Sequence, residues 1–337
     1  MENMHTSLLH KSVDASDLAA EATNVRDQVG ALQAWFGQQP DMHCLLVVER
    51  SQRDPVAGDG SASPAFARLH RTDVVIDHEA LSPAHWPCLL TLDLQVQSGM
   101  SALEESVRMA FEDRRPQSMT EGLGQRIGGW LASSASPGEI ASHFSRLALQ
   151  RDDRNRLCLL RFYDSRAQAL LWPLLTQSQQ HALLGPVRAW HTLDAGARPV
   201  TRMNTQGRRA DFALEPAQWD GIHRHGIVNR ALARHAYENN RQSQPHEVDT
   251  AVAAAMRAQR YGLTDEEDQI AFVGHALAWH PEFDLHPRVL QILGHRSEDD
   301  FYTGLIDELS QDEIADIRQG IWHERLRASA NVSRPGF

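Results

Sequence analysis

The sequence predicts a mixed α/β protein, in which an N-terminal α/β lobe with a partly parallel sheet precedes an all-helical C-terminal lobe. Up to about residue 195, short apolar runs alternate with amphipathic segments, a pattern typical of α/β lobes. After residue 214 only helical periodicity remains, and 337 residues are enough for two such lobes. We therefore expect an N-terminal segment of uncertain structure at 1–40, an α/β lobe at 41–200 and a helical lobe at 214–330.

Four apolar runs are predicted strands, at 44–48, 66–76, 88–96 and 157–163. A short continuous apolar run fits a strand that is covered on both faces, although a buried helix segment gives the same pattern. The run at 157–163 is the clearest strand of the chain. The polar, basic stretch at 194–211 predicts a linker or a long loop between the lobes.

Helix boundaries are predicted from capping residues. Ser101 and Glu104 have the spacing of a capping box, which predicts a helix over 101–112. Gly185 and Pro186 suit the end of a helical pair at 167–184, because glycine adopts the left-handed conformation and proline cannot continue a helix. The remaining predicted helices are 139–149, 215–238, 247–261, 265–279, 299–308 and 311–328, with capping boxes at Thr264/Glu267 and Ser310/Glu313.

Composition argues against several classes of partner. The chain has 33 basic and 44 acidic residues, a net charge of -11, so nucleic acid is not expected to be its main partner. No run of 18 apolar residues is present, so we expect no membrane insertion. The N-terminal residues lack the apolar core of a secretory signal, and the cytoplasm is therefore the expected location.

One group of side chains suggests a metal site. His280, Glu282, Asp284 and His286 alternate with other residues, so in a strand all four would face one way. Prolines at 281 and 287 bracket the stretch and favour a loop between helices instead. No nucleotide-binding or nucleophile motif is complete, and we predict no cofactor, no metal and no catalytic residue.

The stretch from Arg161 to Arg166, RFYDSR, places two guanidinium groups around the carboxylate of Asp164. At the end of a strand, such a carboxylate could serve as a catalytic acid or base. Two neighbouring arginines lower the pKa of a carboxyl group, which disfavours a general acid. We therefore favour a structural ion pair.

The segment LCLLRFYDSRAQALLWPLLTQSQQHALLGPVRAWHTLD resembles the signature region of a bacterial family, the type VI secretion effector adaptors (chaperones), built on the domain of unknown function four-one-two-three. The resemblance extends over about 40–330 and is most specific at 157–190. Two positions depart from the family pattern: Ser165 replaces the usual proline, and Glu49 replaces an aspartate after the first strand. The matching residues are Arg161, Phe162, Tyr163, Asp164, Arg166, Gly185, Pro186 and Trp190.

The resemblance implies a non-enzymatic protein of the bacterial cytoplasm. Such an adaptor binds a type VI effector and helps to load it onto the VgrG spike protein by protein–protein interaction. Two other functions stay open. One is a metal-dependent hydrolase that uses the cluster at 280–286, and the other is a structural component of the secretion apparatus.

Aromatic residues of the helical lobe are the candidate partner contacts, because aromatic anchors dominate many protein interfaces. Trp279 and Phe283 flank the proline-bracketed loop, where we expect exposed backbone, and they are the preferred anchors. The further candidates are Trp219, Phe301 and Tyr302.

Overall fold

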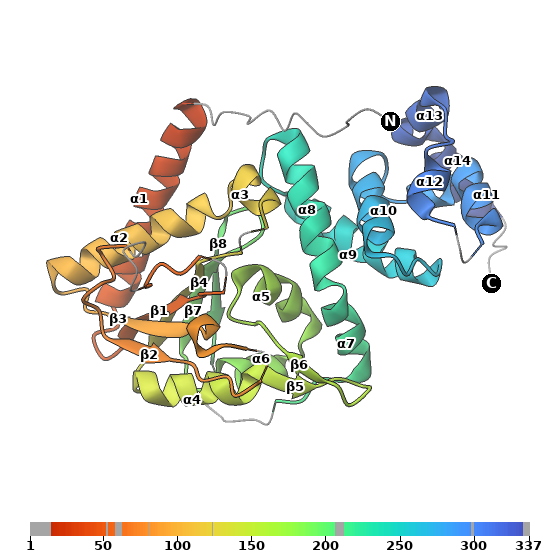
Figure 1. The fold of residues 1–337 in the computed structure, drawn as a ribbon. Helices are drawn as coiled ribbons and strands as arrows, with labels where there is room; N and C mark the ends of the chain where they lie inside the picture. Colours follow the sequence, from red (N-terminus) through yellow and green to blue (C-terminus); the bar gives the residue numbers. More distant parts are fainter. Residues whose placement is uncertain are drawn as a thin grey trace, which may run out of the picture. The chain divides into compact units, whose positions relative to one another are not determined.

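A computed structural model describes residues 15–51, 53–57, 63–79, 81–122, 124–205, 212–297 and 300–332 (Figure 1). The chain forms two compact units. The first, here called the sheet unit, comprises Met1–Arg151, Arg156–Gln168 and Leu175–Ala213. The second, here called the helical unit, comprises Asp152–Asn155, Ala169–Leu174 and Leu214–Phe337.

The sheet unit is built on a six-stranded sheet with the order β2-β3-β1-β4-β7-β8. Every pair of neighbouring strands in this sheet is antiparallel, so the prediction of a mixed α/β fold is confirmed but the expected partly parallel sheet is wrong. The strands are β1 (His43–Val48), β2 (Arg71–Asp73), β3 (Cys88–Leu92), β4 (Ile127–Ser133), β7 (Ala189–Leu193) and β8 (Pro199–Met203).

The position of β1 explains why the sheet is antiparallel despite the strand–helix alternation. β3 and β4 are joined through α2 (Gln97–Glu112) and α3 (Pro116–Thr120), as in a parallel crossover unit. Both strands are antiparallel to β1, so they run in the same direction as each other. However, β1 lies between them and separates the two parallel strands. The sequence pattern predicts the crossover but not the strand inserted into it.

Helices cover both faces of this sheet (Figure 1). Cys44, Leu46 and Val48 face the core formed with α1 (Ala15–Gly37) and α2. Leu45 and Val47 point to the opposite face and are also fully buried. On that opposite face, Trp190 of β7 stacks on Phe144 of α4 (Pro137–Ala148). Because both faces are covered, β1 needs apolar residues at every position, as the sequence predicts.

Two segments of the sheet unit differ from their predicted structure. The predicted strand at 157–163 is reduced to β6 (Leu157–Leu159), which pairs only with β5 (Leu149–Arg151) in a separate two-stranded sheet. The prediction assumed that this apolar run is buried, but Leu157 is 45% exposed. The predicted linker at 194–211 contains β8, which completes the main sheet by pairing with β7. Of the predicted strand at 66–76, only β2 forms.

The first helix after β3 begins four residues before its predicted N-cap. α2 starts at Gln97 with Val96 as N-cap, so Ser101 lies within the helix and its predicted capping box with Glu104 does not form. The first turn packs so closely on the preceding loop that a Cβ at Gly99 would lie 1.9 Å from the Asp93 carbonyl oxygen.

The helical unit contains most of the predicted C-terminal helices with shifted ends. Ser310 and Glu313 form the predicted capping box, whereas the N-cap before Glu266 is Asp265 rather than Thr264. Gly320, at φ 72°, ends one helix and divides the predicted helix at 311–328. The helices are α7 (Pro216–His223), α8 (His225–Asn239), α9 (Pro245–Arg260), α10 (Glu266–Ala278), α11 (Pro287–His295), α12 (Tyr302–Ile306), α13 (Gln311–Gln319) and α14 (Ile321–Val332). None of the helices in the described ranges is both long and apolar enough to span a membrane.

Candidate functional site

The aromatic residues of the RFYDSR stretch and the following segment belong to the core of the sheet unit. Phe144, Phe162 and Trp190 are each 0% exposed. The Phe144 ring is stacked on Trp190 with a centroid distance of 5.3 Å, and it meets Phe162 edge-on at 5.1 Å. Phe162 and Trp190 therefore join the motif segment to α4 and the sheet, and they offer no surface to a partner.

Gly128 of β4 allows the motif backbone to approach the sheet. A Cβ at Gly128 would lie 2.2 Å from the Tyr163 carbonyl oxygen, so only glycine fits there. Trp190 donates a hydrogen bond from Nε1 to the Gly128 carbonyl oxygen at 3.1 Å. Burial raises the pKa of the Tyr163 hydroxyl above its usual value. Gly128 is thus a packing feature of β4.

Gly185 and Pro186 form the turn that follows α6 (Gln177–Leu184). Gly185 has φ 54°, a conformation that side chains disfavour, and a Cβ there would lie 2.3 Å from the His143 ring. The Ser133 hydroxyl donates to the Pro186 carbonyl oxygen at 2.7 Å, and Asn204 Nδ2 donates to the Gly185 carbonyl oxygen at 2.7 Å. The turn is therefore held from β4 and from the end of β8.

Asp164 is the centre of a buried ion-pair cluster. Its carboxylate is 3% exposed and accepts hydrogen bonds from Arg166 Nη2 at 2.9 Å and from the Arg166 backbone amide at 2.9 Å. Arg161 Nη2 lies 3.4 Å from the same carboxylate. Burial alone would raise the pKa of Asp164, but the charge and hydrogen bonds of Arg166, with the charge of Arg161, outweigh it and lower the pKa to about 2. Asp164 is therefore a carboxylate held ionised within the fold.

Both departures from the family pattern take part in this cluster. Glu49 is 3% exposed, and its carboxylate lies 3.4 Å from Arg161 Nη2. The Ser165 hydroxyl accepts a hydrogen bond from Arg114 Nη2 at 2.8 Å, a contact that proline could not make. Burial, followed by the positive charge of Arg166, lowers the pKa of Arg114 to about 10. Ser165 therefore gives a buried guanidinium group an acceptor.

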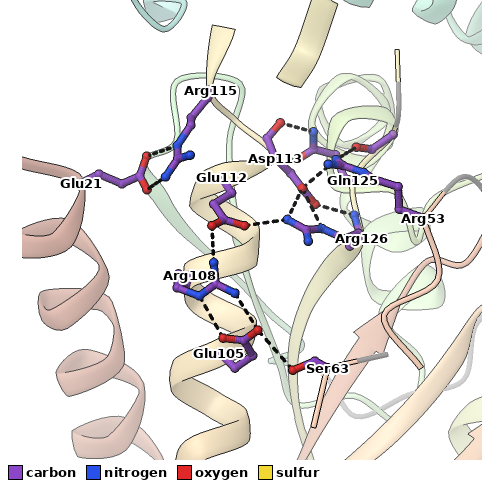
Figure 2. Close-up of polar contacts among 11 residues, drawn as sticks. Glu21, Arg53, Ser63, Glu105, Arg108, Glu112, Asp113, Arg115, Gln125 and Arg126 are labelled. Carbon is purple, nitrogen blue, oxygen red and sulfur yellow. Dashed lines mark hydrogen bonds and ion pairs between the residues drawn. The ribbon is translucent and has the colours of Figure 1, made fainter. Parts of the chain in front are cut away.

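The charged run at the end of α2 is a second buried ion-pair cluster, and it is not among the residues predicted from the sequence. Asp113 accepts hydrogen bonds from Arg53 Nη2 at 2.8 Å, from Arg126 Nε at 2.9 Å and from the Arg126 amide at 2.7 Å (Figure 2). Arg115 forms two hydrogen bonds with Glu21 of α1, at 2.6 and 2.8 Å. The signal was the charged run from 112 to 115 directly before a proline.

A chain of ion pairs continues from Asp113 along the exposed side of α2 (Figure 2). Arg126 Nη2 lies 3.0 Å from Glu112, and Arg108 bridges Glu112 and Glu105. Glu105 accepts a further hydrogen bond from the Ser63 hydroxyl at 3.2 Å. These contacts connect α1, α2, the start of β4 and the segment after β1. The network therefore joins four segments of the sheet unit and is structural.

The predicted partner contacts of the helical unit divide into buried and exposed side chains. Phe283 and Tyr302 are 0% exposed and Trp219 is 3% exposed, so the expectation that Phe283 is a surface anchor is wrong. The loop around Phe283 forms a short 3-10 helix that turns the ring onto Phe272 of α10. Trp279 is partly buried and stacks on His275 at 4.0 Å, whereas Phe301 is 63% exposed.

The candidate metal ligands at 280–286 do not converge. Asp284 is fully buried and its carboxylate is bound by Arg257 Nε at 3.1 Å and by the Tyr261 hydroxyl at 3.3 Å. His286 lies 3.1 Å from Asp316, and Glu282 pairs with His323. Within the described ranges, these four residues contribute no group of three ligand atoms close enough for one ion.

The protein therefore has a mixed α/β fold, and the side chains of the Arg161–Arg166 motif contact one another and the core of the sheet unit. Residues 62–182 match the family model described as Domain of unknown function (DUF4123). For these residues the match confirms the resemblance, and the family is associated with adaptor roles in type VI secretion. The match includes Arg161–Arg166 but ends before Gly185, so it is shorter than the expected 40–330. Searches of curated proteins and of solved structures found no match.

Proposed function

We propose that this protein is a cytoplasmic, non-enzymatic adaptor or chaperone that binds a type VI effector and helps to load it onto the VgrG spike. The observation that carries the proposal is the DUF4123 domain at 62–182, whose motif residues surround Asp164. Because the side chains of these residues contact one another, we assign them a structural role. Partner contact is therefore assigned to side chains outside the motif.

The helical unit offers the most exposed aromatic side chain among the predicted contacts. Phe301 is 63% exposed at the N-cap of α12, and Trp279 is partly buried at the end of α10. An exposed aromatic ring gains most from burial at an interface. We assign Phe301 as an effector anchor and Trp279 as a second contact. Phe283 meets the Trp279 ring edge-on at 5.8 Å from the core, and Tyr302 and Trp219 are buried.

Co-expression tests this assignment. The full chain is co-purified with the protein encoded directly downstream of its gene, and the affinity of the complex is measured by calorimetry. We expect Phe301→Ala to weaken binding at least tenfold with no change in melting temperature, because the ring makes few contacts within its own unit. Val75→Ala is the matched control, since Val75 is 47% exposed in the sheet unit. Equal affinity of Phe301→Ala and wild type would contradict the anchor.

Two further measurements separate the other functions. Deletion of the gene should abolish secretion of one effector and leave the others unaffected, whereas a structural component would be required for all. Metal analysis of the purified chain should find no stoichiometric zinc or manganese, since Asp284 is bound by Arg257 and Tyr261. Stoichiometric metal would support the hydrolase.

A further inference from the structure

Within the described residues, the outer edge of β8 carries main-chain groups without hydrogen-bond partners. In the ladder with β7, the Asp194 amide donates to the Arg198 carbonyl at 2.9 Å, and the Asn204 amide donates to the Arg188 carbonyl at 2.9 Å. Even-numbered residues of β8 therefore face β7, because hydrogen-bonded positions alternate along an antiparallel strand. The amides of Thr201 and Met203 face away from the sheet, and no residue in the described ranges accepts a hydrogen bond from them.

The two edges of the sheet differ in how they are protected. β2 has three residues, and Arg71 and Asp73 form an ion pair at 2.7 Å across it. Short, charged edges of this kind resist pairing with another chain. β8 has five residues, and its one charged side chain, Arg202, is 7% exposed and donates to Gln168 at 2.7 Å. Its only proline is the first residue, so among the described residues no feature of β8 itself blocks an added strand.

The side chains around this edge indicate what it binds. Thr201 and Met203 share one face of the sheet and are exposed, Met203 by 37%, so the neighbouring strand meets uncharged side chains. Arg188 is exposed beside the Met203 end, where it donates to the Asn204 carbonyl oxygen at 2.6 Å. It pairs with no carboxylate in the part of the chain that the structure describes. An acidic side chain on the added strand would supply that partner.

A second copy of this chain fits the edge less well. Antiparallel pairing of two β8 strands about Thr201 would place the Met203 end of one beside the Pro199 end of the other. Arg188 of one copy would then lie near Arg198 of the other, which already pairs with Asp194 at 2.9 Å. Like charges at this contact disfavour self-association.

We propose that the β8 edge binds an extended, acidic segment of the effector as a seventh strand of the sheet. This inference rests on the proposed adaptor function and adds a main-chain docking site to it. Strand addition uses main-chain hydrogen bonds for affinity and alternate side chains for specificity. β8 lies outside the matched segment at 62–182, so this site can be suited to one effector while the family domain is kept.

The test removes one outward-facing amide. Proline is tolerated in an edge strand where its missing N–H faces solvent, so Met203→Pro should fold with a melting temperature close to that of wild type. We expect it to bind the protein encoded downstream at least tenfold more weakly. Met203→Leu keeps the amide and should bind within twofold of wild type. Arg188→Glu should weaken binding at low salt, whereas Arg68→Glu, at an exposed arginine elsewhere in the unit, should not.

Hydrogen exchange gives an independent readout. The Thr201 and Met203 amides should exchange quickly in the free protein and become protected in the complex. Protection already present in the free protein, or a dimer that Met203→Pro dissociates, would overturn the inference because the edge would be occupied. Equal binding by Met203→Pro and wild type would also overturn it and leave the adaptor function intact. If the wild-type chain binds no effector, it is the adaptor function that fails.

Discussion

At the scale of single residues, the energetic importance of Asp164 follows from where its charge is held. The carboxylate is 3% exposed, and two arginines bind it. Breaking a buried ion pair leaves uncompensated charge in the protein, which costs far more than the loss of a surface contact. A catalytic carboxylate needs an oxygen that a substrate can reach. In Asp164, however, both carboxylate oxygens are in contact with arginines.

We predict that Asp164→Ala lowers the free energy of unfolding by about 3–5 kcal/mol, because Arg161 and Arg166 would lose their shared partner. Asp153→Ala, at an exposed aspartate eleven residues earlier, should change it by less than about 0.5 kcal/mol. Urea unfolding at pH 7 measures both. A wild-type melting temperature combined with lost effector binding would instead identify Asp164 as a contact residue.

Protonation of Asp164 at low pH should destabilise the wild-type protein in the same way as Asp164→Ala. The folded pKa of Asp164, about 2, is below its usual value of 3.8, so its contribution is present above pH 4 and disappears as the pH falls towards 2.

At the scale of secondary structure elements, a capping-box spacing in the sequence does not always mark the start of a helix. Ser136 and Glu139 form a reciprocal capping box at the start of α4, with Pro137 in the first turn. Ser101 has the same sequence spacing with Glu104, yet it lies one turn inside α2. The two serines therefore provide a comparison of capping with helix-interior positions.

We predict that Ser136→Ala destabilises the protein by about 1 kcal/mol, because the Glu139 amide loses its acceptor. Ser101→Ala should be neutral or stabilise by up to about 0.5 kcal/mol, since alanine is the better residue within an exposed helix. Denaturant unfolding of the two variants distinguishes the positions. A larger loss at Ser101 than at Ser136 would show that α2 begins at the predicted N-cap.

At the scale of the whole molecule, buried imidazoles make the fold sensitive to mild acid. Burial lowers the pKa of His191, His225 and His275 to about 4 in each case. A lowered histidine pKa means that the unfolded chain binds protons first as the pH falls below about 6.5. Each of the three groups therefore removes stability between pH 6.5 and 4.

We predict that the free energy of unfolding falls by about 1.4 kcal/mol per pH unit for each of these histidines between pH 6 and 4.5. Urea titrations at several pH values measure the slope. His275→Gln should reduce the slope by the contribution of one histidine, about 1.4 kcal/mol per pH unit. His246→Gln, at an exposed position on α9, should leave the slope unchanged. Identical slopes in wild type and His275→Gln would contradict the prediction. The window lies above the acid loss at Asp164, so the two effects are separable.

Local patterns were sufficient wherever the determining contacts lie close in the sequence. The capping box of Ser310 and Glu313 needs only four residues, and it forms as predicted. The RFYDSR stretch likewise identified the family, because its spacing of aromatic and charged residues is itself the signature. By contrast, the partners of Asp113 come from residues 53 and 126, which no local pattern connects.

By itself, therefore, the sequence determined the mixed α/β class, most helix positions, the apolar strand β1 and the family motif, since these depend on periodicity and short-range hydrogen bonds. The tertiary structure alone decided the antiparallel strand order, the burial of Phe283 and Tyr302, and the pairing of β8. Strand neighbours and side-chain exposure depend on which distant segments meet. Equivalent apolar patterns can serve a core strand such as β1 or an exposed hairpin such as β6, and only long-range packing distinguishes them.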